Sequence, residues 1–321
     1  MIRLHAFLSF ILLASTTSGA WYNPYPPSRP VTRYVPVKAE YPLGTDDVET
    51  YGGSAPTCGQ ATEQVTEPGI NDVVTTKNVT WSPLLRQVTL GLSALDVDKA
   101  NNIRVRARTT NLKPDGASIQ VDTWGNTKLY WADSNYVAWG ECASTLEHGT
   151  LHTYEEKVWS KYVKFSEYYD APPTVVVSFY HLDLKPTGNA WRVRAYANDI
   201  TTTGFTVGAE SWASSEAYAV GVSWIAVPAN STTFRAGSYS TSALHDWRNP
   251  SQLHSKALAF SSPLQHNPSV FTGLNYIDMA NDRNLRIKLT QDSISGAGFT
   301  WHIDSWFDSK IMVASASYLA W

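Results

Sequence analysis

Three Arg and three Trp residues recur along this chain at one fixed spacing. Each Arg is followed by a Gly twelve residues later and by a Trp eight residues after that Gly. The sets are Arg104–Gly116–Trp124, Arg192–Gly204–Trp212 and Arg286–Gly298–Trp306. A guanidinium offers donors in a rigid fork, and an indole offers a flat apolar face. Together they can hold a ligand with a hydroxyl rim and a C–H face, which is the chemistry of sugar recognition. The alternative is that the Trp residues are core residues and the Arg residues form a solvated face.

The three sets belong to tandem copies of one domain. Successive Arg residues lie 88 and 94 residues apart, which is too long for a solenoid repeat and long enough for each copy to close its own core. An Asp lies just before each set (Asp96, Asp183, Asp278), and we interpret these residues as capping a turn between strands. We therefore predict independent domains over 58–142, 143–229 and 230–321.

The local pattern within each copy is that of β-strands. Residues 104–108 alternate between polar and apolar, so the apolar set should face a core and the cationic set should face outward. A Gly-containing turn follows, and the next strand leads to the Trp. The run 174–177 is typical of a strand buried on both faces. The sequence predicts an all-β chain of small antiparallel β-sandwiches.

The N-terminal region has the pattern of an exported protein. Residues 1–20 have the charged, apolar, small-residue order of a secretory signal, with cleavage expected after Ala20. The apolar run is too short for a membrane anchor. Residues 21–57 are rich in Pro and Tyr and are expected to form an extended stalk or spacer, either retained or cleaved. We expect a secreted, extracellular protein.

Cysteines, sequons and charge agree with that expectation. Cys58 and Cys142 flank the first copy, and in an oxidising compartment a disulfide between them is favoured over two free thiols. Asn78 and Asn230 begin Asn-x-Ser/Thr sequons and are candidate glycosylation sites. The net charge is −3 and no basic tract is present, which argues against nucleic acid or an anionic membrane as a partner.

Longer segments carry a resemblance to a known family. Residues 90–96 (LGLSALD) and 102–105 (NIRV), followed by Trp124, resemble the H-type lectin domain, the module of the snail agglutinins and of the C-terminal half of discoidins. The second copy matches through 171–175, 202–206 and 221–224, and the third through 273–278 and 298–306. The resemblance covers roughly 58–321, nearly all of the chain beyond the stalk.

The resemblance implies a six-stranded antiparallel β-sandwich that binds galactose-type sugars, especially N-acetylgalactosamine, with no metal or other cofactor. Relatives form trimers with each sugar site near the junction of two protomers. It assigns the sugar-contacting Arg to Arg104, Arg192 and Arg286, and the aromatic closing the pocket to Trp124, Trp212 and Trp306. The residue after each Trp should also line the site, and so should a Tyr six residues after the Trp. These positions are Gly125, Ala213, Phe307, Tyr130 and Tyr218.

The chain departs from the family pattern at several positions. The family often has a His directly after the Trp, which no copy has, and the third copy has Met312 where the Tyr is expected. The family also uses a loop carboxylate that accepts from a sugar hydroxyl. Asp72 could supply it in the first copy and Asp246 in the third, whereas the second offers only Glu155 or Glu156.

Three copies of a trimerising domain suggest that the chain folds as a covalent pseudo-trimer. Its sites would then combine residues of different copies, for example Arg192 with Trp124 or Trp306. The alternative is three separate beads. The expected function is a secreted multivalent lectin for galactose or N-acetylgalactosamine glycans, acting in recognition, adhesion or defence as a monomer or a higher oligomer. The alternative is a structural or adhesive extracellular protein whose degenerate lectin domains act through protein contacts. An enzyme is not expected, because no catalytic constellation stands at characteristic spacing.

Overall fold

The computed structural model describes residues 57–64, 74–80, 85–113, 116–140, 146–154 and 158–321. Most of these residues lie in antiparallel strands, with one short 3-10 helix at Thr241–Ala243, so the all-β prediction is confirmed. No helix in this part of the chain is long and apolar enough to cross a bilayer. The predicted signal and all but the last residue of the predicted stalk lie outside the described residues.

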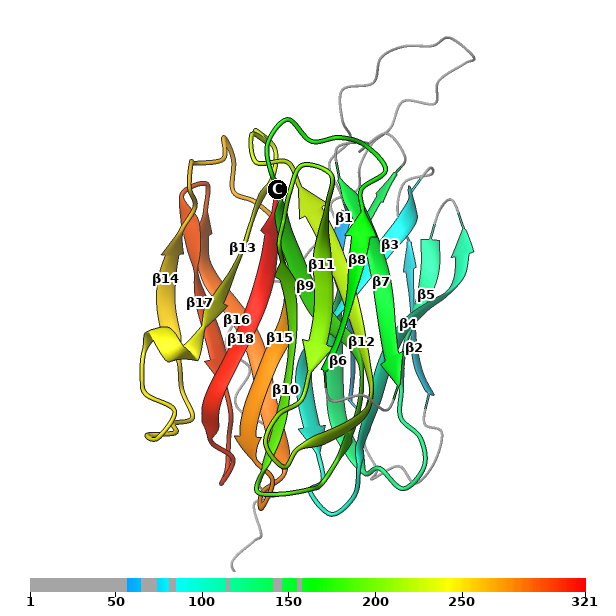
Figure 1. Cartoon of the computed structure of the whole chain (residues 1–321), viewed down its shortest axis with the longest axis vertical. Helices are drawn as coiled ribbons and strands as arrows, with labels where there is room; N and C mark the ends of the chain where they lie inside the picture. Colours follow the sequence, from blue (N-terminus) through cyan, green and yellow to red (C-terminus); the bar gives the residue numbers. More distant parts are fainter. Residues whose placement is uncertain (1–56, 65–73, 81–84, 114–115, 141–145, 155–157) are drawn as a thin grey trace, which may run out of the picture.

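Each copy contributes six strands, labelled in Figure 1. The first copy supplies β1 (Thr57–Gln64), β2 (Val74–Thr80), β3 (Leu85–Val97), β4 (Ile103–Lys113), β5 (Gly116–Asp122) and β6 (Leu129–Gly140). The second supplies β7 (Glu147–Tyr154), β8 (Val158–Lys164), β9 (Thr174–Lys185), β10 (Ala190–Asn198), β11 (Gly204–Glu210) and β12 (Glu216–Val227). The third supplies β13 (Arg235–Ser240), β14 (Ser255–Ala259), β15 (Val270–Ala280), β16 (Leu285–Ser295), β17 (Gly298–Asp304) and β18 (Ile311–Ala320).

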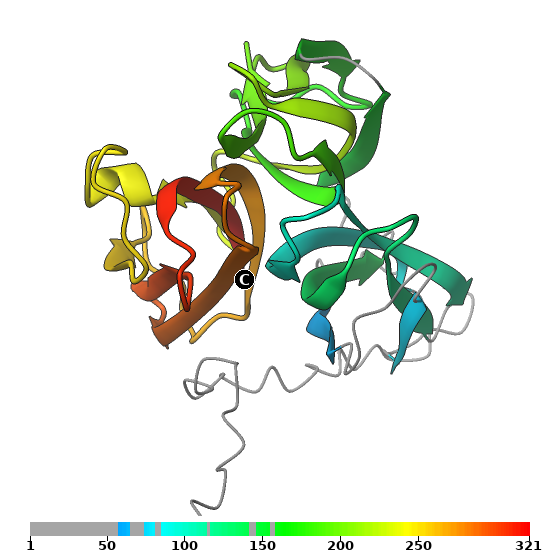
Figure 2. The same ribbon diagram turned by 90° about the horizontal axis from the view of Figure 1, so that it is seen from below.

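Every sheet is shared between two copies. The orders are β1-β6-β3-β16-β17-β14, β13-β18-β15-β10-β11-β8 and β2-β5-β4-β9-β12-β7. The copies therefore join through three antiparallel pairs: β4 with β9, β10 with β15, and β16 with β3. These pairs close a ring, which Figure 2 shows as three lobes around a centre. The pseudo-trimer is confirmed and the arrangement as three separate beads is excluded, because the strands of each copy are continued by strands of a neighbouring copy in the same sheet. We name the three contacts the first–second, second–third and third–first junctions.

A hydrogen bond repeated around the ring shows the same threefold relation. Each bond runs from a polar side chain near the middle of one copy's last strand to a backbone carbonyl in the preceding copy. The bonds are Ser223 Oγ to Leu90 O at 2.6 Å, Ser317 Oγ to Val177 O at 2.8 Å and Asn135 Nδ2 to Thr272 O at 2.8 Å. Because buried polar groups are costly unless paired, these bonds favour one mutual register of the three copies.

The hydrophobic core is also continuous between copies. Alternate residues of β16 from Leu285 onward are buried, as the period-two pattern predicts. A separate apolar cluster takes side chains from all three copies: Val137, Trp139, Leu146, Val176, Ile225, Val227, Phe234, Phe271, Leu319 and Trp321. Removing one copy would break two junctions and expose this cluster and two strand edges of the remaining copies, so the ring is expected to fold as a unit.

The hairpin that leads from each Arg to its Trp contains a left-handed residue. Asn111, Asp199 and Ser293 lie seven positions after the respective Arg, with φ of 50°, 51° and 52°. Between β4 and β5, and between β16 and β17, the pairing register shifts at this point. An extra residue of this kind increases local twist and re-aims the strand that follows. The repeated feature therefore helps place the Trp loop beside the Arg strand.

Candidate functional site

The candidate Arg residues lie at the junctions, where each faces an Asp of the next copy. The Nε-to-carboxylate distances are 3.4 Å for Arg104–Asp183, 3.2 Å for Arg192–Asp278 and 3.4 Å for Arg286–Asp96. These Asp residues lie within β9, β15 and β3, so their interpretation as turn caps is wrong. A carboxylate flanked by apolar residues inside a strand is costly to bury without a partner. Here the partner comes from the neighbouring copy.

Burial controls the electrostatics of these ion pairs. Desolvation raises the pKa of all three carboxyl groups, and in each case the facing guanidinium opposes it. The effect is largest at Asp96, whose pKa rises to about 6. The Arg side chains are only 13–19% exposed, so each guanidinium is held in one place. A guanidinium group that is fixed in this way and still has N–H donors for a ligand can bind two adjacent hydroxyls at a small entropic cost.

Each Trp stands just beyond a strand, in a turn built the same way three times. The residue after the Trp is left-handed in every copy, with φ of 66° at Gly125, 54° at Ala213 and 54° at Phe307. Three residues after the Trp, a Thr or Ser hydroxyl donates to the backbone carbonyl of the residue two positions before the Arg. These bonds are Thr127 to Asn102 at 2.6 Å, Ser215 to Ala190 at 2.7 Å and Ser309 to Asn284 at 2.7 Å. They tie the Trp turn to the Arg strand.

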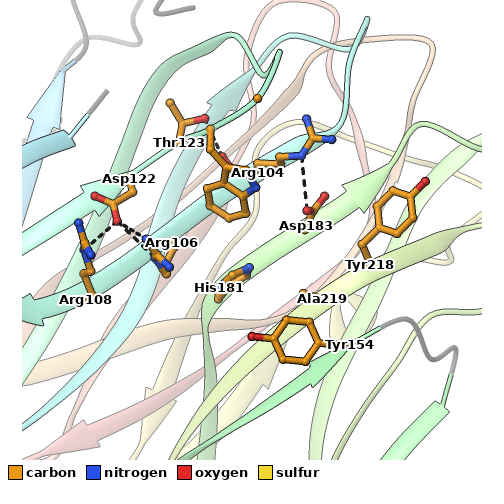
Figure 3. A pocket seen from close by; sticks show the side chains of 12 residues that line it. Arg104, Arg106, Arg108, Asp122, Thr123, Tyr154, His181, Asp183, Tyr218 and Ala219 are labelled. Atoms are coloured by element: carbon orange, nitrogen blue, oxygen red, sulfur yellow. Dashed lines mark hydrogen bonds and ion pairs between the residues drawn. The ribbon is translucent and has the colours of Figure 1, made fainter. Parts of the chain in front are cut away.

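The first–second junction contains an open pocket of about 820 Å³. The first copy lines it with Arg104, Arg106, Arg108, Asp122, Thr123, Trp124 and Gly125, and the second with Tyr154, His181, Asp183, Tyr218 and Ala219. Figure 3 shows Arg104 facing Asp183, with Tyr218 and Tyr154 on the side of the second copy. Arg104 also donates from Nη1 to Asn126 at 2.8 Å. The pocket therefore combines a fixed cation, an indole and two accessible phenol rings.

The wall of this pocket beside Trp124 is formed by His181. Their ring centroids lie 5.1 Å apart in an edge-on arrangement, and His152 packs edge-on behind His181 at 4.4 Å. Neither ring nitrogen of His181 has a hydrogen-bond partner among the described residues. Burial lowers the pKa of His181 to about 3. It therefore acts as a neutral aromatic wall at physiological pH.

The third–first junction is closed at the equivalent position. Ala219 lines the open pocket, but the corresponding residue of the first copy is Trp131, which packs on Trp306 with centroids 5.8 Å apart. Trp306 is consequently only 8% exposed, and Lys288 Nζ lies 4.4 Å from the centre of the Trp131 ring. Arg286 is engaged further by Asp308 at 2.8 Å. The groups that could meet a ligand are covered or already paired.

The second–third junction is intermediate. Trp212 packs against Tyr276 of the third copy with centroids 5.2 Å apart, and Arg192 faces Asp278 two residues further along the same strand. Arg194 is paired with Glu210 beside it. Trp212 remains only partly buried, so its indole is not covered as that of Trp306 is.

The structure reassigns several predicted combinations. Each Arg shares its junction with the Trp of its own copy, so the example pairing of Arg192 with Trp124 or Trp306 is wrong. Tyr218 lines the pocket of Arg104. Tyr130 donates its hydroxyl to Asp98 at 3.1 Å. Burial raises the pKa of Tyr130, Asp98 adds to the rise, and the smaller effects of Asp96 and Arg286 place it beside the third–first junction.

The predicted loop carboxylates have no described contact with these sites. Asp246 lies in the loop after the 3-10 helix, is half exposed and pairs with Arg248 of the same loop at 3.3 Å. Asp72, Glu155 and Glu156 lie outside the described residues, as do Cys142 and the side chain of Cys58. The two candidate glycosylation residues, Asn78 and Asn230, are exposed. No cluster of three potential metal ligands occurs among the described residues.

The residues contributed by the facing strand could not be identified from the sequence pattern. Asp183 and His181 occupy one face of β9, and Arg106, Arg108 and Asp122 continue the wall from β4 and β5. An Asp between two apolar residues in a strand pattern does signal a buried carboxylate that needs a cation. The identity of that cation could be found only from the pairing of β4 with β9.

Comparison with known proteins agrees with this arrangement. The H-type lectin domain family matches the chain over residues 87–139, 160–227 and 255–321, one segment in each copy. No curated protein shows significant sequence similarity to the chain.

Proposed function

Because the chain belongs to the H-type lectin domain family, which is a carbohydrate-binding family, we propose that it is a secreted lectin for terminal galactose or N-acetylgalactosamine. It acts without a metal ion, in recognition, adhesion or defence. The observation that carries the proposal is the open pocket of the first–second junction, where Arg104 and Trp124 share one cavity with Asp183.

The geometry suits a pyranose ring in a specific way. The C–H face of the sugar would lie against the indole of Trp124, and its hydroxyls would accept from the Nη donors of Arg104 that are not used on Asn126. Asp183 holds Nε of Arg104 at 3.4 Å, so the guanidinium is oriented before the ligand arrives. Such preorganisation reduces the entropic cost of binding.

The three junctions are proposed to differ in competence. The first–second junction is the principal site, and the second–third junction is a second one because Trp212 is partly exposed. The third–first junction does not bind, since Trp131 covers Trp306. Two linked sites engaging one glycan-bearing surface can raise avidity by about a hundredfold over a single site.

A glycan array with residues 21–321, run with and without a chelator, tests the proposal. Binding to galactose or N-acetylgalactosamine termini should persist in chelator. The double variant Arg104→Ala/Trp124→Ala should lose most of it. A matched control removes the same two residue types at Trp247 and Arg248, an exposed pair outside the junctions whose cation lies 4.6 Å from the ring centre. Equal binding by the two double variants would reject the site.

The structural-adhesive alternative has one specific observation in its favour. The closed third–first junction shows that a copy can keep the fold while covering its Trp. If the folded chain bound no glycan on a broad array, this reading would replace the lectin. The same purified chain should then bind a protein partner or itself.

A further inference from the structure

Two arginines of the first–second pocket share one carboxylate. Asp122 Oδ2 accepts from Arg106 Nε at 3.2 Å and Nη2 at 2.8 Å, and it lies 2.8 Å from Arg108 Nε. The side chain of Asp122 is 5% exposed, whereas those of Arg106 and Arg108 are 38% and 43% exposed. Figure 3 shows both guanidinium groups converging on this carboxylate. The buried anion thus holds two cations at the rim of the pocket.

The equivalent positions of the other copies lack this excess charge. In the second copy Arg194 is paired with Glu210, and the position of Arg108 is taken by Tyr196. In the third copy that position is Thr290. Arg104 is already matched by Asp183, and His181 is neutral. Among the described residues that line it, the first–second pocket therefore has three arginines and two carboxylates, which leaves one positive charge in excess. The protein as a whole has a net charge of −3, so this charge is a local feature.

The excess cation lies where the sugar would bind. Arg106 Cζ is 5.7 Å from the centre of the Trp124 ring, and Arg106 and Arg108 line the same cavity as Arg104. A guanidinium has five donors. Arg106 uses Nε and Nη2 on Asp122, and Arg108 faces it with Nε. Within the part of the chain that the structure describes, Nη1 of Arg106 and both Nη groups of Arg108 have no other acceptor. Arg forks of this kind suit carboxylate and sulfate-like oxyanions.

We propose that the first–second pocket selects acidic saccharides, in which a sulfate ester or carboxylate on the sugar stacked at Trp124 is bound by Arg106 and Arg108. This inference rests on the proposed function and adds a ligand class to it. Asp122 opposes the approach of an anion, but its charge is already shared by two guanidinium groups. A hydrogen bond to a charged group is stronger than one between neutral partners. The same interaction weakens with salt because the arginines are partly exposed.

The test compares ligands that differ only in charge. Residues 21–321 would be titrated with a methyl galactoside, its 3-O-sulfate and 6-O-sulfate, and the corresponding galacturonide, at low and high ionic strength. We expect at least one acidic ligand to bind about tenfold more tightly than the neutral one, with the preference shrinking at high salt. Preference for the sulfates or for the uronide identifies the source of the anion, and either result supports the proposal.

Two variants assign the effect to the pocket. Arg108→Gln should reduce the acidic-to-neutral affinity ratio about tenfold. Lys161→Gln, which removes the same charge from an exposed position on β8, should leave the ratio unchanged. Neutral galactoside binding with no acidic preference would overturn this inference and leave the lectin intact. An acidic preference that Arg108→Gln does not reduce would also overturn it. If none of the four ligands bound, the proposed function itself would be overturned.

Discussion

Asp96, in the ring-closing pair of β3 with β16, should make stability depend on pH in an unusual direction. Its side chain is 8% exposed and faces Arg286 at 3.4 Å. Burial raises its pKa from 3.8 to about 6, and Arg286 offsets only part of that rise. In the unfolded chain the carboxyl group should return to its ordinary pKa. The perturbation we consider is Asp96→Asn, which keeps the shape of the side chain and removes its titration.

The sign and size follow from proton linkage. Between about pH 4 and pH 6 the folded protein holds the proton of Asp96 and the unfolded chain does not. The stabilising contribution of this group is therefore complete below pH 4 and is lost as the pH rises to 6. A shift of roughly two pKa units corresponds to about 3 kcal/mol, since each unit is worth about 1.36 kcal/mol. The wild-type protein should lose that much stability across this window relative to Asp96→Asn.

Urea unfolding at a series of pH values between 4 and 7 measures the difference. Other titrating groups cancel when the unfolding free energies of wild type and variant are subtracted. Asp246→Asn is the matched control, because Asp246 is exposed and the backbone N–H of Arg248 lowers its pKa. Because the pKa of Asp246 is lowered, its contribution to stability should be lost as the pH falls, which is the opposite of the effect of Asp96. If the difference in unfolding free energy between wild type and Asp96→Asn did not change with pH, the burial of this carboxyl group would be refuted. The closed junction that buries it would be refuted as well.

Three further predictions follow from the shared sheets and the unequal junctions. The isolated second copy, residues 143–229, should fail to fold, because β9 and β10 lose their partner strands. Circular dichroism checks this, and a fragment that folds and unfolds cooperatively would contradict the prediction. Trp131→Val, which installs the residue of the third copy at that position, should cost about 3 kcal/mol of stability and uncover Trp306. Calorimetry should then find one more glycan site per chain, and an unchanged number would count against Trp131 as the plug. For His181, burial lowers the pKa to about 3, so the folded state resists protonation and stability is lost as the pH falls below 6.5. His181→Tyr should remove about 2 kcal/mol of the loss between pH 7 and pH 5 in thermal or urea unfolding, and the same acid sensitivity in variant and wild type would exclude His181 as its source.

Much of the fold could be predicted because it depends on local spacing. The period-two alternation of 104–108 and 286–289 predicts strands, since side chains of a strand alternate between a buried and a solvated face. The constant interval from Arg to Trp predicts one hairpin in three copies, and the structure builds the same left-handed positions in each. The pseudo-trimer was an inference from family resemblance, which the sheet orders confirm.

The partners of these residues could not be predicted in the same way. The sequence predicts Asp183 as a turn cap, but in the structure it pairs with Arg104 of the preceding copy, and no local pattern indicates that partner. The alternation of 104–108 predicts a solvated face for Arg106 and Arg108, and both are partly exposed, but the structure places them at the rim of a pocket. Local patterns report whether a side chain is buried, not which distant strand faces it.

The sequence by itself therefore determined the β-class, the three copies and the Arg–Trp pairs that mark each candidate site. Only the tertiary structure decided which junctions are open. Ala219 and Trp131 occupy equivalent positions in their copies, and each is distant in sequence from the Trp that it faces. Ala219 leaves Trp124 accessible, whereas Trp131 covers Trp306. The physical reason is that every site is completed by the next copy around the ring. Its shape depends on side chains brought together by strand pairing between copies rather than by proximity in sequence.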